Sequence, residues 1–481
     1  MKRLRCSSLL GIIVTLCVVA IVAPPARGQE AAAVATKLTA ATPFTDHMVL
    51  QRDTQARVWG WAEPGAEVEV KFADKAATCM ADDAGRWEAA IGPFEASAEP
   101  RTLTVTTGDE SLAFDDVLVG EVWIASGQSN MEWPVALTND AEQEIAAAKW
   151  PEIRLFDVPH RVSEEPQTTV DTQGWKACTP ETVKNFSAVA YFFGRKLHDE
   201  LDVPIGLMSV NWGGTMMEAW TSREALHEAD AFTAMIDNLR PLDEMPEDQR
   251  GTPHRAGVLF NAMLAPMIPY DIRGAIWYQG ESNAGRHQQY RELSEVMIAD
   301  WRARWNEGEF PFLLVQLAAW EPGGDNWPYL RESQAQCCEL PNVGMAVTTD
   351  IGHRTDIHPR NKQEVGRRLA LIALSMAYGQ DVVHSGPKYR DMQIDGSEVT
   401  LRFDHAAGLK HDGDELAGFE LAGTDGKFRP ASAEIADGKV ILSSDEVTEP
   451  AAVRYNWASF PAGTLRNEAG LPAEPFRTDS W

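Results

Sequence analysis

Four short segments rich in glycine and polar residues directly follow apolar, strand-like runs, and their residue types suit one chemistry. They are residues 126–134, 212–215, 279–283 and 349–359. Ligands of open parallel sheets bind beyond the carboxyl ends of the strands, so a site is expected where these segments meet. Acyl transfer needs a nucleophile, a base, a group that orients the base and donors for the oxyanion, and the four segments together hold all of these residue types.

Ser129 and His358 are the residues we expect to react. Ser129 is flanked by small and polar residues that allow a sharp backbone turn, so its hydroxyl could stand at the sheet edge as the nucleophile. His358, with a pKa near neutrality, could take the hydroxyl proton and return it. Asp356 or Glu281 could fix the imidazole tautomer and stabilise its charged form, as the acid of a Ser-His-Asp arrangement does.

The oxyanion could be held by backbone and side-chain donors of the same segments. The backbone N–H groups of Ser129 and of Gly213 or Gly214 are candidates, together with the side-chain amide of Gln279 or Asn283. Each residue also has a simpler explanation, because Ser129 could cap a helix and the two glycines could form a plain turn. The coincidence of four loops at one sheet edge favours the catalytic interpretation. No Gly-x-Ser-x-Gly elbow surrounds Ser129, so the α/β-hydrolase pattern is not matched.

Elements that could position these residues alternate between strand and helix patterns, which predicts an α/β domain with a parallel sheet. The predicted strands are 119–125, 153–158, 205–211, 274–278, 312–317 and 344–348, and the predicted helices are 187–201, 289–305 and 362–378. Period-2 stretches on either side predict two β modules, with strands at 57–62, 67–72, 101–105, 398–403, 418–422, 439–443 and 453–457. We therefore expect an N-terminal β module over 42–116, an α/β domain over 117–385 and a C-terminal β module over 386–481.

The beginning of the chain predicts export. Basic residues precede an apolar run over 9–23, and small residues occupy the positions before Gln29, as in a secretory signal peptide covering 1–28. A linker over 29–41 follows. Fifteen apolar residues are short for a bilayer span, so no stable membrane anchor is expected after cleavage, and the protein should reach the periplasm or the extracellular space.

Charge and cysteine content limit the partners. The formal net charge of −28 over 481 residues disfavours nucleic acid and anionic membranes, which need a basic face. Four cysteines, Cys79, Cys178, Cys337 and Cys338, remain after the signal peptide; they do not form a disulfide framework, and their pairing is left open. No metal-ligand spacing is visible, so neither a metal nor another cofactor is predicted. Oligomeric state is not predicted.

Several long motifs resemble the sialate O-acetylesterase family, a branch of the SGNH hydrolases. They are GQSNMEW at 127–133, WYQGESN at 277–283 and IHPRNKQ at 357–363, supported by MVLQR at 48–52, WGGT at 212–215 and VRYNW at 453–457. The resemblance implies a flavodoxin-like three-layer core with flanking β-sandwich-like modules. It also implies that Ser129 is the nucleophile, that His358 is the base, and that a glycine and a polar amide hold the oxyanion without a cofactor.

One position departs from the pattern of that superfamily. SGNH enzymes often place the acid three residues before the histidine, and Thr355 occupies that position here. The orienting acid is therefore Asp356, Glu281 or Asp350, with Asp356 preferred, unless a backbone carbonyl takes its place. The resemblance favours acetylated sialic acid as substrate, whereas the acidic charge favours a neutral acetylated polysaccharide such as acetylxylan. A glycan-binding protein without activity is the alternative from another class.

Overall fold

A parallel sheet forms the centre of the protein in the computed structural model, which describes residues 37–480. Its strand order is β10-β9-β11-β8-β12-β13-β14, and every neighbouring pair is parallel except β10 with β9. The six predicted strands are confirmed. The strands are β8 (Glu110–Gly127), β9 (Trp150–Asp157), β10 (Lys176–Cys178), β11 (Ile205–Asn211), β12 (Gly274–Tyr278), β13 (Phe312–Val315) and β14 (Val343–Ala346).

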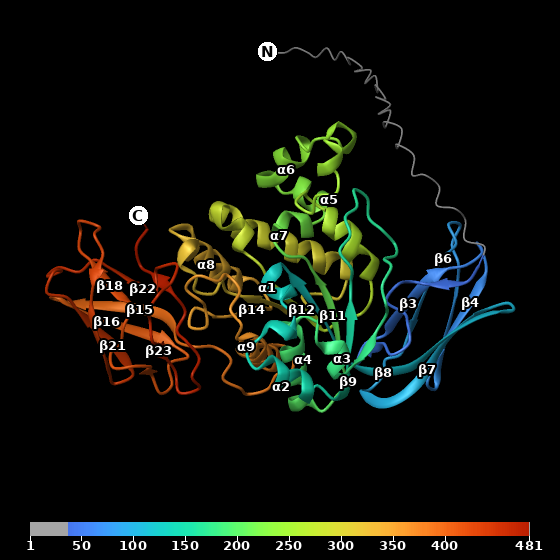
Figure 1. Cartoon of the computed structure of the whole chain (residues 1–481), viewed down its shortest axis with the longest axis horizontal. Helices are drawn as coiled ribbons and strands as arrows, with labels where there is room; N and C mark the ends of the chain where they lie inside the picture. Colours follow the sequence, from blue (N-terminus) through green and yellow to red (C-terminus); the bar gives the residue numbers. More distant parts are fainter. Residues whose placement is uncertain (1–36, 481) are drawn as a thin grey trace, which may run out of the picture.

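Helices cover both faces of this sheet and complete a three-layer core (Figure 1). On one face, α4 (Ala188–Leu201) packs against α9 (Lys362–Met376), and their apolar residues share a core with β8 and β11. On the other face lie α7 (His287–Trp305) and α8 (Asn326–Gln336). The three predicted helices are confirmed, and the flavodoxin-like expectation is confirmed with them.

The N-terminal β strands are joined to the core by a single long strand. The first half of β8 pairs antiparallel with β7 (Ser97–Thr107), whereas its second half pairs in parallel with β11 and β12. The position 116/117, where we expected a domain border, therefore lies inside one strand. Further strands of this part are β1 (Thr39–Ala40), β2 (Val49–Gln51), β3 (Ala56–Trp61), β4 (Glu67–Phe72), β5 (Lys75–Met80) and β6 (Arg86–Ile91).

The C-terminal strands form antiparallel sheets around a hydrophobic core of their own. The main strands are β15 (Lys388–Asp395), β16 (Glu398–Asp404), β18 (Phe419–Ala422), β20 (Ser432–Ala436), β21 (Lys439–Ser443) and β22 (Ala452–Tyr455). Arg331 of α8 ties this part to the central domain. Its fully buried guanidinium donates to the carbonyls of Leu317 and Ala318 in the central domain, and to those of Ala458 and Ser459 in the C-terminal part, at 2.7–3.0 Å.

Two further expectations concern the N-terminal segment and the four cysteines. The predicted signal peptide and most of the linker lie outside the described residues. Within residues 37–480, no helix has the length and apolar character needed to cross a membrane. Cys79, Cys178, Cys337 and Cys338 are all free thiols.

Candidate active site

The segment after β8 places Ser129 at the carboxyl edge of the sheet. Gly127 has a φ of +135°, and a Cβ there would lie 2.2 Å from the carbonyl oxygen of Tyr278 on β12, so only glycine fits. The N–H of Gln128 donates to the same carbonyl at 3.0 Å. Ser129 then begins the short helix α1 (Ser129–Glu132), whose first N–H groups have no partner within the helix.

His358 reaches Ser129 from the loop between β14 and α9. Its Nε2 atom lies 2.9 Å from the Ser129 Oγ atom, a hydrogen-bond distance between groups 229 positions apart in the chain. The indole of Trp133 stacks on the imidazole, with ring centroids 4.8 Å apart. Burial lowers the pKa of His358 below its usual value and the charge of Lys362 adds to this, while Asp356 opposes both. The imidazole is therefore neutral at pH 7 and able to accept a proton.

Asp356 is the acid nearest to the imidazole, but the contact is loose. Its Oδ1 atom lies 3.5 Å from His358 Nδ1, and the Asp356 side chain is 42% exposed. The same oxygen accepts the backbone N–H of His358 at 2.9 Å. Asp356 therefore holds the backbone of the loop, and its negative charge stabilises the protonated imidazole, without a short hydrogen bond to the ring.

The other two candidate acids are engaged elsewhere. Glu281 accepts a hydrogen bond from the side-chain amide of Asn130 at 2.6 Å, and burial raises its pKa. Asp350 pairs with Arg368 and with Arg466 of the C-terminal part, at 2.7–2.9 Å. Although burial would raise the pKa of Asp350, these arginines hold it below its usual range. The structure thus brings neither carboxylate to the His358 ring.

Of the two candidate glycines, Gly213 lies beside the serine. A Cβ built on Gly213 would be 3.2 Å from Ser129 Cβ, and its N–H donates to Glu132 Oε2 at 2.6 Å. Gly214 has a φ of +75°, and its carbonyl accepts the Ser282 hydroxyl at 3.0 Å. Gly214 therefore supplies the turn, while Gly213 is the glycine that lies near Ser129.

The amides of Gln279 and Asn283 are used inside the protein. Gln279 is fully buried, and its Nε2 atom donates to the Asn283 side chain at 2.7 Å and to the Thr215 carbonyl at 3.2 Å. Asn283 in turn donates to Glu218 at 3.0 Å and accepts the N–H of Met217 at 3.1 Å. The structure therefore places both amides in a network that shapes the loop after β12, with their hydrogen bonds directed to other protein groups and not to Ser129.

His160 is a site residue that the sequence reasoning missed. It follows β9, its Nε2 lies 3.2 Å from Glu132 Oε1, and its ring stacks on Trp212 with centroids 4.3 Å apart. The hydrogen bond with Glu132 raises the pKa of His160, with burial opposing it. Applying the rule of carboxyl strand ends to the predicted strand 153–158 would have pointed to it.

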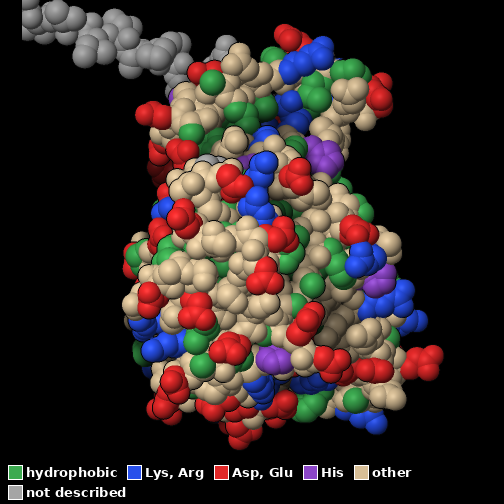
Figure 2. Space-filling view, turned by 90° about the vertical axis from the view of Figure 1, so that its left-hand side faces the viewer, with side chains coloured by type: hydrophobic (Ala, Val, Ile, Leu, Met, Phe, Trp, Pro, Cys, Tyr) green, Lys and Arg blue, Asp and Glu red, His purple; other side chains and the backbone are tan. Residues whose placement is uncertain are grey.

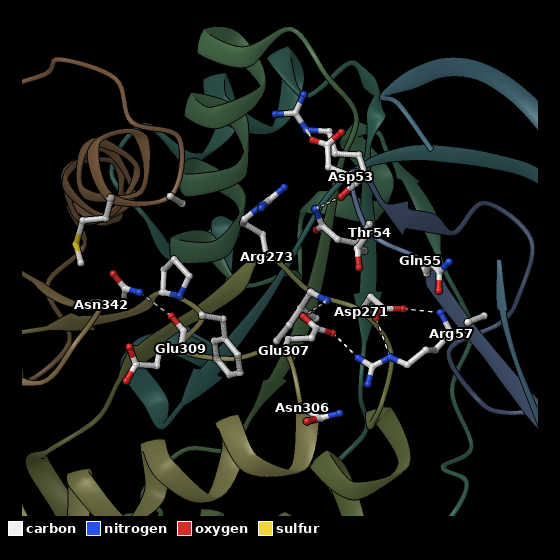
Figure 3. Close-up of a pocket in the computed structure, with 18 residues that line it drawn as sticks. Asp53, Thr54, Gln55, Arg57, Asp271, Arg273, Asn306, Glu307, Glu309 and Asn342 are labelled. Atoms are coloured by element: carbon white, nitrogen blue, oxygen red, sulfur yellow. Dashed lines mark hydrogen bonds and ion pairs between the residues drawn. The ribbon is translucent and has the colours of Figure 1, made fainter. Parts of the chain in front are cut away.

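A hollow of about 660 Å³ lies elsewhere, between the amino ends of β12 to β14 and the N-terminal part (Figure 3). Among its charged groups, Arg57 pairs with Asp271 at 2.8 Å and with Glu307. It occupies the edge of the sheet opposite to Ser129. Among the described residues, no group of three or more histidine, cysteine or carboxylate side chains is placed to hold a metal ion.

A flavodoxin-like core with a serine and a histidine in contact at the carboxyl edge of its sheet defines a hydrolase of the SGNH class. Comparison with known proteins identifies the family. The model of the family described as carbohydrate esterase, sialic acid-specific acetylesterase matches residues 119–375. The sialate O-acetylesterases of Homo sapiens and Mus musculus are each 30% identical to this chain, across 91% of it and 91% and 93% of their own lengths.

A solved structure gives the same result. A carbohydrate acetylesterase from Xanthomonas citri is 41% identical, with a TM-score of 0.85 over 92% of this chain and 100% of that one. The chain therefore belongs to the sialic acid-specific acetylesterase family of carbohydrate esterases, and it is a carboxylic ester hydrolase.

Proposed function

We propose that the protein is an exported serine esterase that removes O-acetyl groups from carbohydrates, with acetylated sialic acid as the preferred substrate. The 2.9 Å contact between Ser129 Oγ and His358 Nε2 carries the proposal, because it joins a nucleophile to a neutral base at the edge where substrates of such sheets bind. The acetylated substrate class follows from the family and from the names of its relatives.

The reaction needs two displacements at one carbonyl carbon. His358 Nε2 takes the proton of Ser129 while Oγ bonds to the acetyl carbon; the C–O bond to the sugar then breaks, and the sugar oxygen receives that proton. Water next gives a proton to His358 and attacks the acetyl-serine. The Oγ–acetyl bond breaks, Ser129 regains its proton from His358, and acetic acid leaves and ionises to acetate in the solvent.

The N–H groups of Ser129 and Gly213 are the donors we assign to the oxyanion. The Gly213 N–H is engaged by Glu132 in this structure, so Glu132 must release it when a carbonyl oxygen arrives. His160, 3.2 Å from the other carboxylate oxygen, offers Glu132 an alternative partner, and the raised pKa of His160 favours the protonated form that balances the carboxylate charge. Without that balance, a carboxylate next to a developing negative charge would raise the barrier.

A neutral acetylated polysaccharide such as acetylxylan is the second candidate substrate. The net charge of −28 repels anionic sugars at long range, and Figure 2 shows acidic side chains scattered over the face of the molecule that it presents. Salt screens such a field within about 8 Å, so contacts next to Ser129 decide the preference. The names of the curated relatives favour sialate. Export rests on the signal-like pattern of residues 1–28.

Acetate release tests the proposal directly. Purified protein without residues 1–28 is given O-acetylated sialic acid and acetylated xylan in parallel, and acetate is measured with time. Ser129→Ala should lower the rate by at least about 10³-fold. Ser444→Ala should not, because this hydroxyl lies in the C-terminal part, where it donates to the Pro430 carbonyl at 3.0 Å and accepts the N–H of Glu446 at 3.4 Å. Equal rates for Ser129→Ala and wild type would refute serine catalysis, and faster release from xylan would replace sialate by the second candidate.

A further inference from the structure

A chain of buried hydrogen bonds runs directly behind the Ser129–His358 pair, and the reaction as derived above does not use it. Asn130 lies at its centre, with 1% of its surface exposed. Its Oδ1 atom accepts a hydrogen bond from the fully buried Lys362 ammonium. Its Nδ2 atom donates to Glu281 Oε1 at 2.6 Å and to the carbonyl of Ile357 at 3.1 Å.

These three partners fix the orientation of the Asn130 amide. Turning the amide over would set its NH₂ group against the ammonium of Lys362, donor to donor. It would also set its oxygen against Glu281 and the Ile357 carbonyl, acceptor to acceptor. Buried groups that lose their partners are costly, so a single orientation is retained. The Asn130 side chain is therefore a rigid connector and not a mobile polar group.

The Asn130 side chain joins the same two chain segments that carry the reacting atoms. Asn130 is the neighbour of Ser129 in the chain, and Ile357 is the neighbour of His358. We propose that Asn130 is a positioning residue, held by Lys362 and Glu281, that fixes the distance between the serine and histidine segments. This inference rests on the proposed serine esterase function and assigns a role to Glu281 other than that of the acid beside His358.

The weak support that His358 receives from elsewhere makes such a connector necessary. In a Ser-His-Asp triad the acid holds the imidazole, but Asp356 is 3.5 Å from His358 Nδ1 and its side chain is 42% exposed. The loop that carries His358 therefore needs another contact to keep Nε2 aimed at Ser129. The hydrogen bond from Asn130 to Ile357 provides it at backbone level, together with the stacking of Trp133 on the imidazole.

The charges around Lys362 explain why an amide and a carboxylate accompany it. Burial lowers the pKa of Lys362 to about 7, while Glu281 and Asp356, the carboxylates that face it, oppose this shift. The ring of Tyr278 lies 5.1 Å from the ammonium and that of Trp133 lies 5.9 Å from it. An uncharged Lys362 still has N–H groups to donate, so the orientation of Asn130 survives on both sides of neutral pH.

Kinetics of four variants test the positioning role on the full mature chain, with nitrophenyl acetate as the probe. Asn130→Ala should lower kcat by about 10- to 100-fold with little change in KM, because misplacing a reacting group acts on the chemical step. Asn467→Ala is the matched control: Asn467, in the C-terminal part, is equally buried and donates to the carbonyls of Ser385 and His405. It should lower the melting temperature and leave kcat within about twofold.

Glu281 provides the second comparison, which remains informative if Asn130→Ala does not fold. Glu281→Gln keeps an oxygen that accepts from Asn130, whereas Glu281→Leu fills the space without an acceptor. The glutamine variant should retain a clearly higher kcat than the leucine variant. Equal losses in both, or a folded Asn130→Ala enzyme with kcat within twofold of wild type, would overturn the inference. Failure of the proposed function would show differently, as full activity in Ser129→Ala.

Discussion

Replacing Asp356 by asparagine would remove one negative charge beside the base and keep the backbone of the loop in place. Asp356 Oδ1 accepts the N–H of His358 at 2.9 Å, and the amide oxygen of asparagine can do the same. The distance from Oδ1 to His358 Nδ1 is 3.5 Å, which is longer than an ordinary hydrogen bond. The substitution therefore tests the effect of the charge on the imidazole and little else.

The size of the effect follows from the distance and the exposure. Two unit charges 3.5 Å apart attract each other by about 1.2 kcal/mol in water and by about 5 kcal/mol at an effective dielectric constant of ~20. The Asp356 side chain is 42% exposed and that of His358 is 26% exposed, so solvent screening keeps the value near the lower figure. Since about 1.4 kcal/mol is a factor of ten in rate, kcat/KM should fall by about tenfold.

The same substitution should also move the pH dependence of the rate in a defined direction. Asp356 favours the imidazolium, so its loss should lower the pKa of His358 further and move the acidic limb of the pH–rate profile to lower pH. Initial rates with nitrophenyl acetate from pH 4.5 to 9 measure both quantities. A loss near the ~10⁴-fold that a fully formed triad shows on this substitution would contradict the loose contact. A shift of the acidic limb to higher pH would contradict the electrostatic reasoning.

Three further measurements follow from the geometry. Gly213→Ala would place a methyl group 3.0 Å from Glu132 Oε2 and 3.2 Å from Ser129 Cβ, so kcat should fall by about tenfold or more, and an unchanged kcat would separate Gly213 from the reaction. Wild-type kcat/KM should decline below about pH 6 as His358 gains a proton, because its pKa lies under the usual 6.5; a rate flat to pH 4 would exclude a histidine base. Arg331→Met should lower the melting temperature measured by calorimetry, because each buried carbonyl left without a donor costs about 1–3 kcal/mol. An unaltered melting curve would contradict the role of Arg331 in joining the C-terminal part to the central domain.

The central strands and helices could be predicted because their sequences are continuous and apolar. Strands 205–211 and 274–278 begin and end where the sequence analysis placed them, as expected for strands buried on both faces. The border at 116/117 could not be anticipated in the same way. The change near residue 117 from period-2 stretches to alternating strand and helix patterns predicted a border, yet Asp116 has a φ of +56° inside β8 and the strand continues beyond it.

The site could be predicted in its residue types but only partly in its contacts. The rule of carboxyl strand ends brought the segments of Ser129 and His358 together, because parallel strands share one edge. Which carboxylate faces which partner depends on loop conformations that no spacing rule determines. Glu281 therefore remained one of three candidate acids in the sequence analysis, whereas in the structure it accepts a hydrogen bond from Asn130. Lys362 was overlooked because a lysine at the start of a helix is almost always exposed, whereas this one is fully buried.

Covalent labelling of the serine tests the central claim most directly. Protein without residues 1–28 is treated with a fluorophosphonate ester at neutral pH, and the modified peptide is located by mass spectrometry. A serine activated by His358 should give one adduct, on Ser129, with activity lost in step, and His358→Ala should slow the labelling strongly. Inactivation with Ser129 unmodified, or labelling of Ser129 at the same rate in His358→Ala, would contradict the account.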